Sequence, residues 1–314
     1  MGIYDLRDEY AGSPVFRFDQ SRLDEDAEGL PELPAPGDAA WCVATEFDEE
    51  AWDEVWKLFR ETVDTTGITT LMLGYWGAEY DSDYTYPVPV LVEAAASFPA
   101  LRHLFIGEIT AEESEISWID HGDITPIFEA FPNLERLDVR GAEHLTMQPV
   151  AHAGLRTLRF ESGGLPAAVV RAVGASDLPN LEHLDLWLGT AGYGGDATPA
   201  DLAPILSGER LPALRHLGLE DAEIQDDVAE AVAGAPVVAR LESLSLAMGI
   251  LTDRGAEALL AGQPLTHLQK LELRHHFLSE PMMERVRAAL PDVTVGLDDR
   301  QKPDGEWFFI EVSE

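Results

Sequence analysis

Apolar residues recur along the chain in the spacing Leu-x-x-Leu-x-Leu, with Ile, Val or Phe at some of the leucine positions. The motif occurs nine times, counting a degenerate last copy, and successive copies start 21 to 33 residues apart. The copies begin at Ile68, Leu101, Leu134, Leu155, Leu181, Leu214, Leu241, Leu268 and Leu290. Most of these steps lie in or near the range of about 20–29 residues that is typical of leucine-rich repeats. The spacing predicts a repeat array over residues 48–297.

Each motif predicts a β-strand, and the stretch after it predicts a helix. Alternate side chains of a strand point to opposite faces, so parallel stacking of the copies would bury each row of leucines. The stretch Thr252–Gly262 has clear helix signals: a capping threonine, an early acid, apolar residues at helical spacing and a final glycine. Similar signals predict helices at 49–63, 89–98, 124–131, 166–174, 198–208, 226–234 and 279–290.

The predicted fold class is α/β: a leucine-rich-repeat solenoid, or horseshoe, with a parallel concave β-sheet and convex helices. Strand–loop–helix units of this length resemble the ribonuclease-inhibitor class of leucine-rich repeat. The two ends differ from the repeats, as the ends of a solenoid must to cover their apolar ladders. Residues 1–47 contain strand-like runs at 14–18 and 39–47 and are predicted to form an N-terminal cap. Residues 298–314 contain such a run at 306–312 and are predicted to form a C-terminal cap strand.

Charge and composition narrow the expected partners and compartment. The 314 residues include 58 Asp plus Glu and 21 Lys plus Arg, a formal net charge of -37 at pH 7. Such a surface repels phosphate backbones and anionic lipid, so we predict neither a nucleic-acid nor a membrane partner. No apolar run is long enough for a signal peptide or a membrane helix, and the single cysteine, Cys42, excludes an internal disulfide. These features predict an acidic, cytoplasmic protein.

The third, fifth and seventh positions of each motif are expected to point into the concavity. Of the 24 such positions in the eight full motifs, five are basic, five are acidic and three are histidine, so this surface is less acidic than the whole chain. Twelve of them are candidate ligand-binding residues: His103, Phe105, Arg136, Asp138, Arg140, Arg159, His183, Asp185, Trp187, His216, Lys270 and Arg274. Facing charges on neighbouring strands could instead merely neutralise one another, and both interpretations stay open.

Two features of this surface suggest how it would hold a ligand. Arg136, Arg140 and Arg159 fall on two adjacent predicted strands, and guanidinium groups match carboxylate-rich or phosphorylated ligands. The long repeats also carry aromatic loops, in which Trp76, Trp118 and Tyr193 are further candidates. Exposed aromatic residues are common interface anchors, and Trp76 and Trp187 are the preferred ones here. The loops could equally fold back over the first repeats.

No motif predicts catalysis. His183, His216 and Asp185 are expected to be neighbours and have donors that suit a divalent metal, but a solvated histidine pair is the preferred interpretation, so no metal and no cofactor are predicted. The glycine-rich loop at 189–196 lacks the Gly-Lys-Ser/Thr ending of a nucleotide-binding loop. No Gly-x-Ser-x-Gly, His-Glu-x-x-His or Cys-x-x-Cys occurs. The chain is therefore predicted not to be an enzyme.

Several short stretches spread over nearly the whole chain carry a resemblance to a family. They lie at 62–66, 115–118, 160–166, 184–188, 193–196, 261–265, 297–301 and 312–314. In these the chain resembles an actinobacterial branch of a bacterial family of cytoplasmic leucine-rich-repeat proteins. The resemblance implies the fold and the compartment and carries over no catalytic residue. It also implies genes next to those of ATP-grasp-like and radical-SAM-like proteins, and so a scaffold or recognition role in a modification pathway.

The sequence thus predicts a non-catalytic scaffold that binds a protein or peptide through the concave sheet and the aromatic edge loops. The alternative is an accessory subunit that completes the active site of an ATP-grasp-like or radical-SAM-like modification enzyme. A purely structural role, with the acidic surface as an adaptation to salt, is a third possibility.

Overall fold

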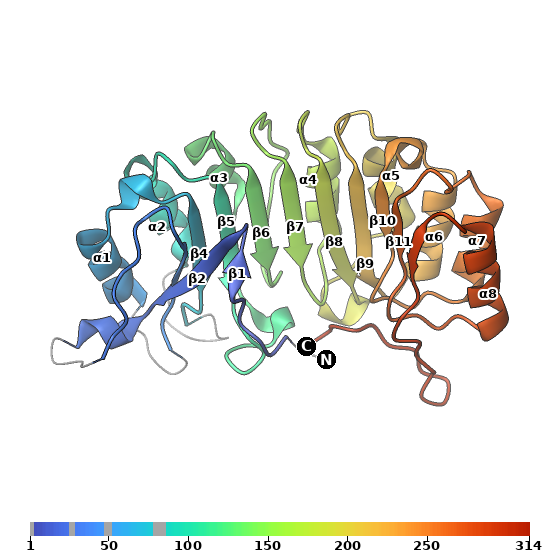
Figure 1. Cartoon of the computed structure of the whole chain (residues 1–314), viewed down its shortest axis with the longest axis horizontal. Helices are drawn as coiled ribbons and strands as arrows, with labels where there is room; N and C mark the ends of the chain where they lie inside the picture. The colour runs from blue at the N-terminus through green and yellow to red at the C-terminus, as the bar shows by residue number, and fades with distance from the viewer. Residues whose placement is uncertain (1–2, 25–28, 47–51, 78–85) are drawn as a thin grey trace. The chain divides into compact units, whose positions relative to one another are not determined.

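Residues 3–24, 29–46, 52–77 and 86–314 are described by the computed structural model of the chain. They belong to two compact units, residues 2–146 and residues 147–314, which we call the N-terminal unit and the C-terminal unit. Each unit consists of strands that follow one another in chain order, with helices between them (Figure 1). The predicted α/β class and the repeat-like, mostly parallel arrangement of strands are confirmed in both units.

In the N-terminal unit each strand pairs with the next along the chain, antiparallel for the first pair and parallel for the others. The strands are β1 (Glu9–Tyr10), β2 (Ser13–Phe18), β3 (Ala40–Val43), β4 (Thr70–Gly74), β5 (His103–Glu108) and β6 (Arg136–Arg140). The α-helices are α1 (Trp52–Thr62), α2 (Pro87–Glu93) and α3 (Thr125–Ala130). Short 3-10 turns are η1 (Gln20–Leu23), η2 (Thr65–Gly67), η3 (Ala95–Ser97) and η4 (Ile116–Trp118).

In the C-terminal unit all the pairings between successive strands are parallel. The strands are β7 (Thr157–Glu161), β8 (His183–Gly189), β9 (His216–Ala222), β10 (Ser243–Ser245), β11 (Lys270–Glu272) and β12 (Thr294–Gly296). The α-helices are α4 (Ala167–Ala175), α5 (Pro199–Ser207), α6 (Gln225–Ala233), α7 (Asp253–Ala261) and α8 (Glu280–Ala289). Two 3-10 turns are η5 (Ala191–Tyr193) and η6 (Pro236–Arg240).

Three helices of the C-terminal unit, α5, α7 and α8, begin at side chains that cap free backbone N–H groups. The Thr252 side chain accepts a hydrogen bond from Arg254 N at the start of α7, and Ser279 accepts one from Met282 N at the start of α8. Thr198 and Asp201 form a capping box at the start of α5. Such caps each stabilise a helix by about 1 kcal/mol. Seven of the eight predicted helices occur close to their predicted bounds, although residues 49–51 of the first lie outside the described residues. The helix predicted at 89–98 is shorter: α2 ends at Glu93, and the 3-10 turn η3 follows.

The motif leucines form the core. In the eight full motifs every residue at the three apolar positions, from Ile68 to Leu273, is at most 3% exposed. The strands align them in register, so that Leu184, Leu217 and Leu244 lie side by side on β8, β9 and β10. Each such side chain contributes about 1.5–3 kcal/mol on burial, before the entropy cost of ordering. The degenerate last copy is looser, because Val295 is only half-buried.

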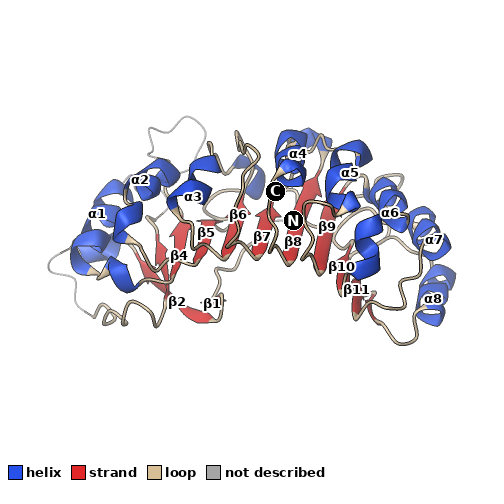
Figure 2. Ribbon diagram, turned by 90° about the horizontal axis from the view of Figure 1, so that it is seen from above, coloured by secondary structure: helices blue, strands red, loops and turns tan. Residues whose placement is uncertain are grey.

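In each unit the helices lie along one face of the strands (Figure 2). We call the opposite face of each unit its open face. The predicted register of that face is confirmed at the third and fifth motif positions: His103 aligns with Arg136, and Asp185 with Arg159 and Gly218. Among the described residues, no helix is both long and apolar enough to cross a membrane.

One predicted position shifts by a residue. The seventh position of the second motif was expected to be Gly107, but Gly74 of β4 aligns with Glu108 of β5. The backbone bulges here because Gly107 adopts φ +89, and a Cβ on it would meet the Arg140 carbonyl oxygen at 2.3 Å. A left-handed residue in such close backbone contact has to be glycine. The shift brings the Glu108 carboxylate into the row.

The predicted final strand over 306–312 is wrong. The last strand is β12, and the tail turns at an isolated bridge between Asp304 and Trp307. The tail then runs beside the C-terminal unit, where Glu311 N donates to the Met248 carbonyl and Val312 N to the Asp221 carboxylate. The apolar run of the tail resembles a strand in sequence, but only Ile310 and Val312 are buried, whereas Trp307, Phe308 and Phe309 stay exposed.

The leucine ladder leads to a stability prediction. Replacing Leu217, which is fully buried in β9, by alanine is expected to lower the free energy of unfolding by about 2–5 kcal/mol, because it leaves a cavity that neighbouring repeats cannot close. Urea denaturation measures the loss. Glu209→Gln, at an exposed position, is the matched control and should change the stability by less than about 0.5 kcal/mol. Equal stability of Leu217→Ala and the wild type would contradict the ladder.

Candidate functional site

The open face of the N-terminal unit is covered by the chain's own N-terminal segment, residues 3–10. Arg7 N donates to Glu108 Oε1 at 2.7 Å, and Arg7 Nη1 donates to Glu108 Oε2 at 2.8 Å. The Arg7 guanidinium also lies over the Phe105 ring at 4.5 Å. Tyr10 packs edge-on against Phe105 and donates to the Leu104 carbonyl at 3.0 Å. Phe105, a predicted contact residue, is therefore fully buried under this segment.

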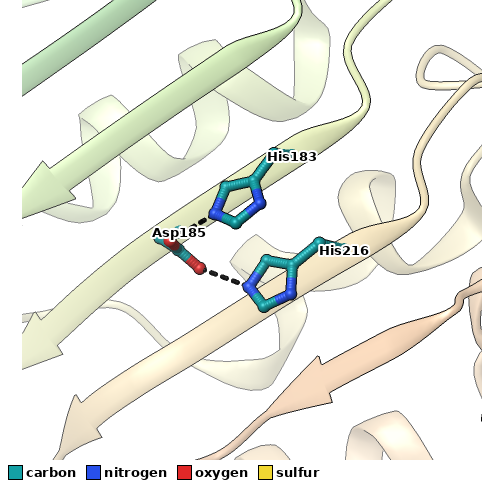
Figure 3. A group of neighbouring side chains, drawn as sticks. All are labelled: His183, Asp185 and His216. Atoms are coloured by element: carbon teal, nitrogen blue, oxygen red, sulfur yellow. Dashed lines mark hydrogen bonds and ion pairs between the residues drawn. The ribbon is translucent and has the colours of Figure 1, made fainter. Parts of the chain in front are cut away.

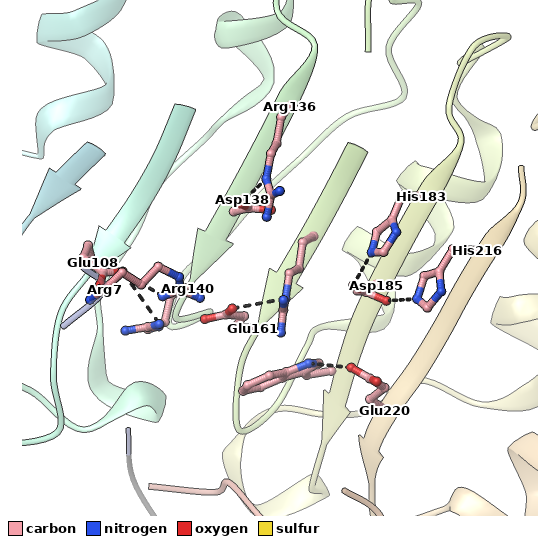
Figure 4. A network of polar contacts seen from close by, with 12 residues as sticks. Arg7, Glu108, Arg136, Asp138, Arg140, Glu161, His183, Asp185, His216 and Glu220 are labelled. Carbon is pink, nitrogen blue, oxygen red and sulfur yellow. Dashed lines mark hydrogen bonds and ion pairs between the residues drawn. The ribbon is translucent and has the colours of Figure 1, made fainter. Parts of the chain in front are cut away.

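Arg136 and Arg140, which we predicted to bind an anionic ligand, contact other groups of this unit instead. Arg136 Nε lies 2.7 Å from Asp138 Oδ2, and the Arg136 guanidinium covers the Tyr10 ring at 5.0 Å. Arg140 is 1% exposed and donates to the Ile109 carbonyl at 2.9 Å, with Glu108 3.7 Å away (Figure 4). Arg140 and Glu108 thus pair across neighbouring strands, as the second of our two interpretations predicts, whereas Arg136 pairs with Asp138 of its own strand.

His103 and the aromatic loop of this unit are also engaged internally. His103 Nδ1 lies 3.1 Å from Thr70 Oγ1, and burial lowers the pKa of the His103 imidazole. Trp76 is only 1% exposed and packs edge-on against Tyr86 and His121, so its expected role as an exposed anchor is wrong. Trp76 and Tyr86, at the two described ends of this loop, both pack on His121. Tyr80 and Tyr84, also in this aromatic loop, lie outside the described residues. Trp118, by contrast, is 49% exposed.

The open face of the C-terminal unit carries a chain of paired polar groups on β7, β8 and β9. Arg159 Nε lies 3.1 Å from Glu161 Oε1, and its guanidinium lies over the Trp187 ring at 5.3 Å. Trp187 Nε1 in turn donates to Glu220 Oε2 at 2.9 Å. Trp187 is 5% exposed, so it supports this surface and is not the exposed anchor that we predicted.

His183, Asp185 and His216 meet at the centre of this face (Figure 3). Both imidazoles bond through Nε2 to one carboxylate: His183 Nε2 lies 2.7 Å from Asp185 Oδ2, and His216 Nε2 lies 2.7 Å from Asp185 Oδ1. The two rings stack with centroids 3.9 Å apart and planes 11° apart. His216 Nδ1 lies 2.6 Å from Ser243 Oγ. The sequence predicted this neighbourhood, and the structure confirms it.

The pKa values of two carboxyl groups on this face, Asp185 and Glu220, are shifted in opposite directions. Burial acts to raise the pKa of Asp185, but the hydrogen bonds to His183 and His216 outweigh it and hold that pKa well below its usual range. Burial and the nearby Asp185 charge raise the pKa of Glu220, against the hydrogen bond that Ser245 donates to it. Asp185 is therefore a carboxylate anion at neutral pH.

Gly218 makes the geometry of Asp185 possible. It occupies the fifth motif position of β9, beside Asp185 of β8. A Cβ at Gly218 would lie 2.1 Å from Asp185 Oδ1, which is far inside any contact distance. The missing side chain lets the carboxylate lean across β9 to reach His216.

The C-terminal tail runs along the carboxyl ends of β8 to β11. Arg274 pairs with Glu311, and Tyr193 donates a hydrogen bond to Glu314. Tyr193 thus contacts the tail and is half-buried. Lys270 pairs with Glu272 at 3.0 Å and keeps 54% of its side chain exposed. The sequence did not predict that residues 3–10 and the C-terminal tail contact these candidate residues. The single arginine among the acids at 5–9, Arg7, could have indicated the first contact.

The buried imidazole of His121 gives a pH prediction. Burial lowers its pKa to about 4, against a hydrogen bond to the Arg140 carbonyl, whereas an unfolded histidine has a pKa of about 6.5. Below about pH 6.5 the unfolded chain takes up the proton first, so stability falls as pH drops towards 4, by about 3 kcal/mol in all. We expect His121→Gln, which removes the titrating group, to flatten this decline in urea denaturation at pH 7, 5.5 and 4.5.

His144→Gln is the control for that experiment. His144 is exposed, and its hydrogen bond to Asp120 raises its pKa, so its loss should leave the decline in place. An equally steep decline in wild type and His121→Gln would show that other groups cause it.

The chain is similar to a protein of known structure. A scan against protein-family models finds no match, and a search of curated proteins finds no relative. Among solved structures, the chain is similar to a Bacteroides fragilis protein whose crystal structure was determined by the Northeast Structural Genomics Consortium. The TM-score is 0.78 and the sequence identity 30%, over 88% of this chain and 78% of that one. At this identity over most of both lengths, the chain belongs to the same family as the Bacteroides fragilis protein.

Proposed function

We propose that the protein is a non-catalytic scaffold of the leucine-rich-repeat type, which binds an extended, basic segment of a partner protein on the open face of its C-terminal unit. The repeat type is supported by the Leu-x-x-Leu-x-Leu spacing together with parallel strands whose leucines are buried and whose connections are helices. Solenoids of this kind commonly bind partners along the exposed positions of their sheets.

The observation that supports this most strongly is the way the chain occupies its own open face. Residues 3–10 lie on the N-terminal unit as a peptide would: Arg7 contacts the buried Glu108 carboxylate (Figure 4). The same guanidinium lies over the Phe105 ring. Glu108, the acceptor, is 1% exposed; Arg140 lies 3.7 Å from it, and Arg7 makes the closer ion pair at 2.8 Å. The same face of the fold therefore accepts a cationic segment.

The C-terminal unit offers similar chemistry without its own basic segment in the described residues. Its open positions on β7, β8 and β9 carry three acids, Glu161, Asp185 and Glu220, and one arginine, Arg159, which pairs with Glu161. Asp185 pairs with two histidines. The formal charge of -37 on the whole chain also attracts a cationic partner over long range. A basic segment thus fits better here than the carboxylate-rich or phosphorylated ligand considered from sequence, because each of Arg136, Arg140 and Arg159 lies against a carboxylate.

Selection from a random octapeptide library tests the proposal. The full chain is used as bait in the presence of a chelator, and we expect enrichment of arginine or lysine alternating with apolar residues. The affinity of selected peptides, measured by fluorescence anisotropy, should fall as salt rises. Glu220→Gln should weaken binding about tenfold, which corresponds to about 1.4 kcal/mol, since it removes the charge and keeps an acceptor for Trp187 Nε1.

Glu209→Gln removes an acid at an exposed position outside this face and is the matched control. Binding should be unchanged in it. Enrichment of acidic peptides, or equal weakening by the two substitutions, would contradict a basic partner on the C-terminal unit.

A further inference from the structure

His183, Asp185 and His216 place three metal-binding atoms together on two neighbouring strands. Parallel pairing of β8 with β9 aligns His183 with His216, and Asp185 lies two residues further along β8 (Figure 3). The two Nε2 atoms and a carboxylate oxygen all lie within 4.8 Å of one another. Metal–nitrogen and metal–oxygen bonds of about 2.0–2.2 Å require ligand atoms closer together than about 4.4 Å, so small side-chain rotations complete the site.

The surroundings of the cluster are built to hold these side chains. Gly218 leaves the space that the Asp185 carboxylate fills, since a Cβ there would lie 2.1 Å from Oδ1. Ser243 Oγ lies 2.6 Å from His216 Nδ1 and fixes that ring from behind. A hydroxyl or carbonyl partner on the second ring nitrogen is the usual support of a metal-bound histidine. The carboxylate is 7% exposed at its side chain, so it is desolvated and already aimed at both imidazoles.

The open side of the cluster faces solvent. The side chain of His183 is 40% exposed and that of His216 is 21% exposed, so the rings can tilt from their parallel stack towards a common ion. Three protein ligands with room for solvent are the composition of open metal sites, in contrast to the four-ligand structural sites. Imidazole nitrogen with carboxylate oxygen suits zinc, cobalt, nickel or ferrous iron rather than calcium or magnesium.

We propose that His183, Asp185 and His216 form a binding site for a divalent transition metal ion, through the two Nε2 atoms and the Asp185 carboxylate. Each Nε2 gives up the proton that it now donates to Asp185: a neutral imidazole carries that proton on Nδ1 instead, where Ser243 Oγ can accept it at His216, and an imidazolium releases one proton to solvent. Remaining coordination positions are left to water or to a ligand atom from outside the chain. The site stands on these residues alone and does not depend on the binding of a basic peptide.

Two titrations of the untagged, chelator-treated full chain test the site. Zinc is followed by calorimetry, and cobalt by its visible absorption, which is strong when the ion has four or five ligands. We expect one ion per chain and an affinity that rises with pH, because the metal displaces protons from the histidines. His183→Gln and His216→Ala should each weaken binding at least a hundredfold, and Ser243→Ala about tenfold, as loss of a supporting hydrogen bond does.

His103→Ala is the matched control, since His103 occupies the same motif position on β5 and bonds to Thr70 instead of a carboxylate. It should bind zinc and cobalt like the wild type. His183→Gln changes a largely exposed side chain, and a wild-type melting temperature for this variant shows that lost binding is not lost folding. The absence of a cobalt spectrum, or equal binding by wild type and the double variant His183→Gln/His216→Ala, would overturn the proposal and assign any bound metal to scattered acids.

Discussion

The burial of the leucine rows determines which side chains of each strand face the helices and which lie on the open face. Leu184, Leu217 and Leu244 align across β8, β9 and β10 and face the helices. The residues next to each leucine along its strand must face the other way, because side chains alternate along a strand. A slip by one residue would bury His216 or Asp185 in place of leucine, at a cost of several kcal/mol. The positions of the polar groups on the open face are thus a consequence of the apolar ladder.

This constraint creates a problem that the two units solve differently. An open face that carries Met72 and Phe105 is too apolar to remain in water, and the N-terminal unit covers it with Tyr10 and Arg7. The corresponding positions of the C-terminal unit are polar, and they satisfy one another through short bonds such as that of Trp187 to Glu220. Fewer of its side chains need a cover, so more of them stay within reach of solvent.

The sequence predicted the repeats, the helices and the register of the open face, because leucine spacing and capping residues are local signals. It also predicted that His183, Asp185 and His216 are neighbours, since equal motif positions on successive strands must be. It could not predict which open positions are covered. That depends on where residues 3–10 and 306–314 return in space, and both contacts join residues up to 121 positions apart in the chain. The strand predicted at 306–312 is wrong for the same reason. An apolar run indicates that some of its residues are buried, but not whether its backbone pairs with a sheet.

The arrangement at Asp185 shows how a glycine at a regular position changes the chemistry of a surface. Three other charged fifth-position residues, Asp138, Arg159 and Glu272, pair with a residue of their own strand. At Gly218 the neighbouring strand presents no side chain, so Asp185 crosses to it and binds an imidazole on each strand. A purely stabilising pair would need only His183, which lies on the same strand as Asp185. Two histidines instead converge on one desolvated carboxylate with their outer side open to water, which concentrates three possible metal ligands at one point of the face.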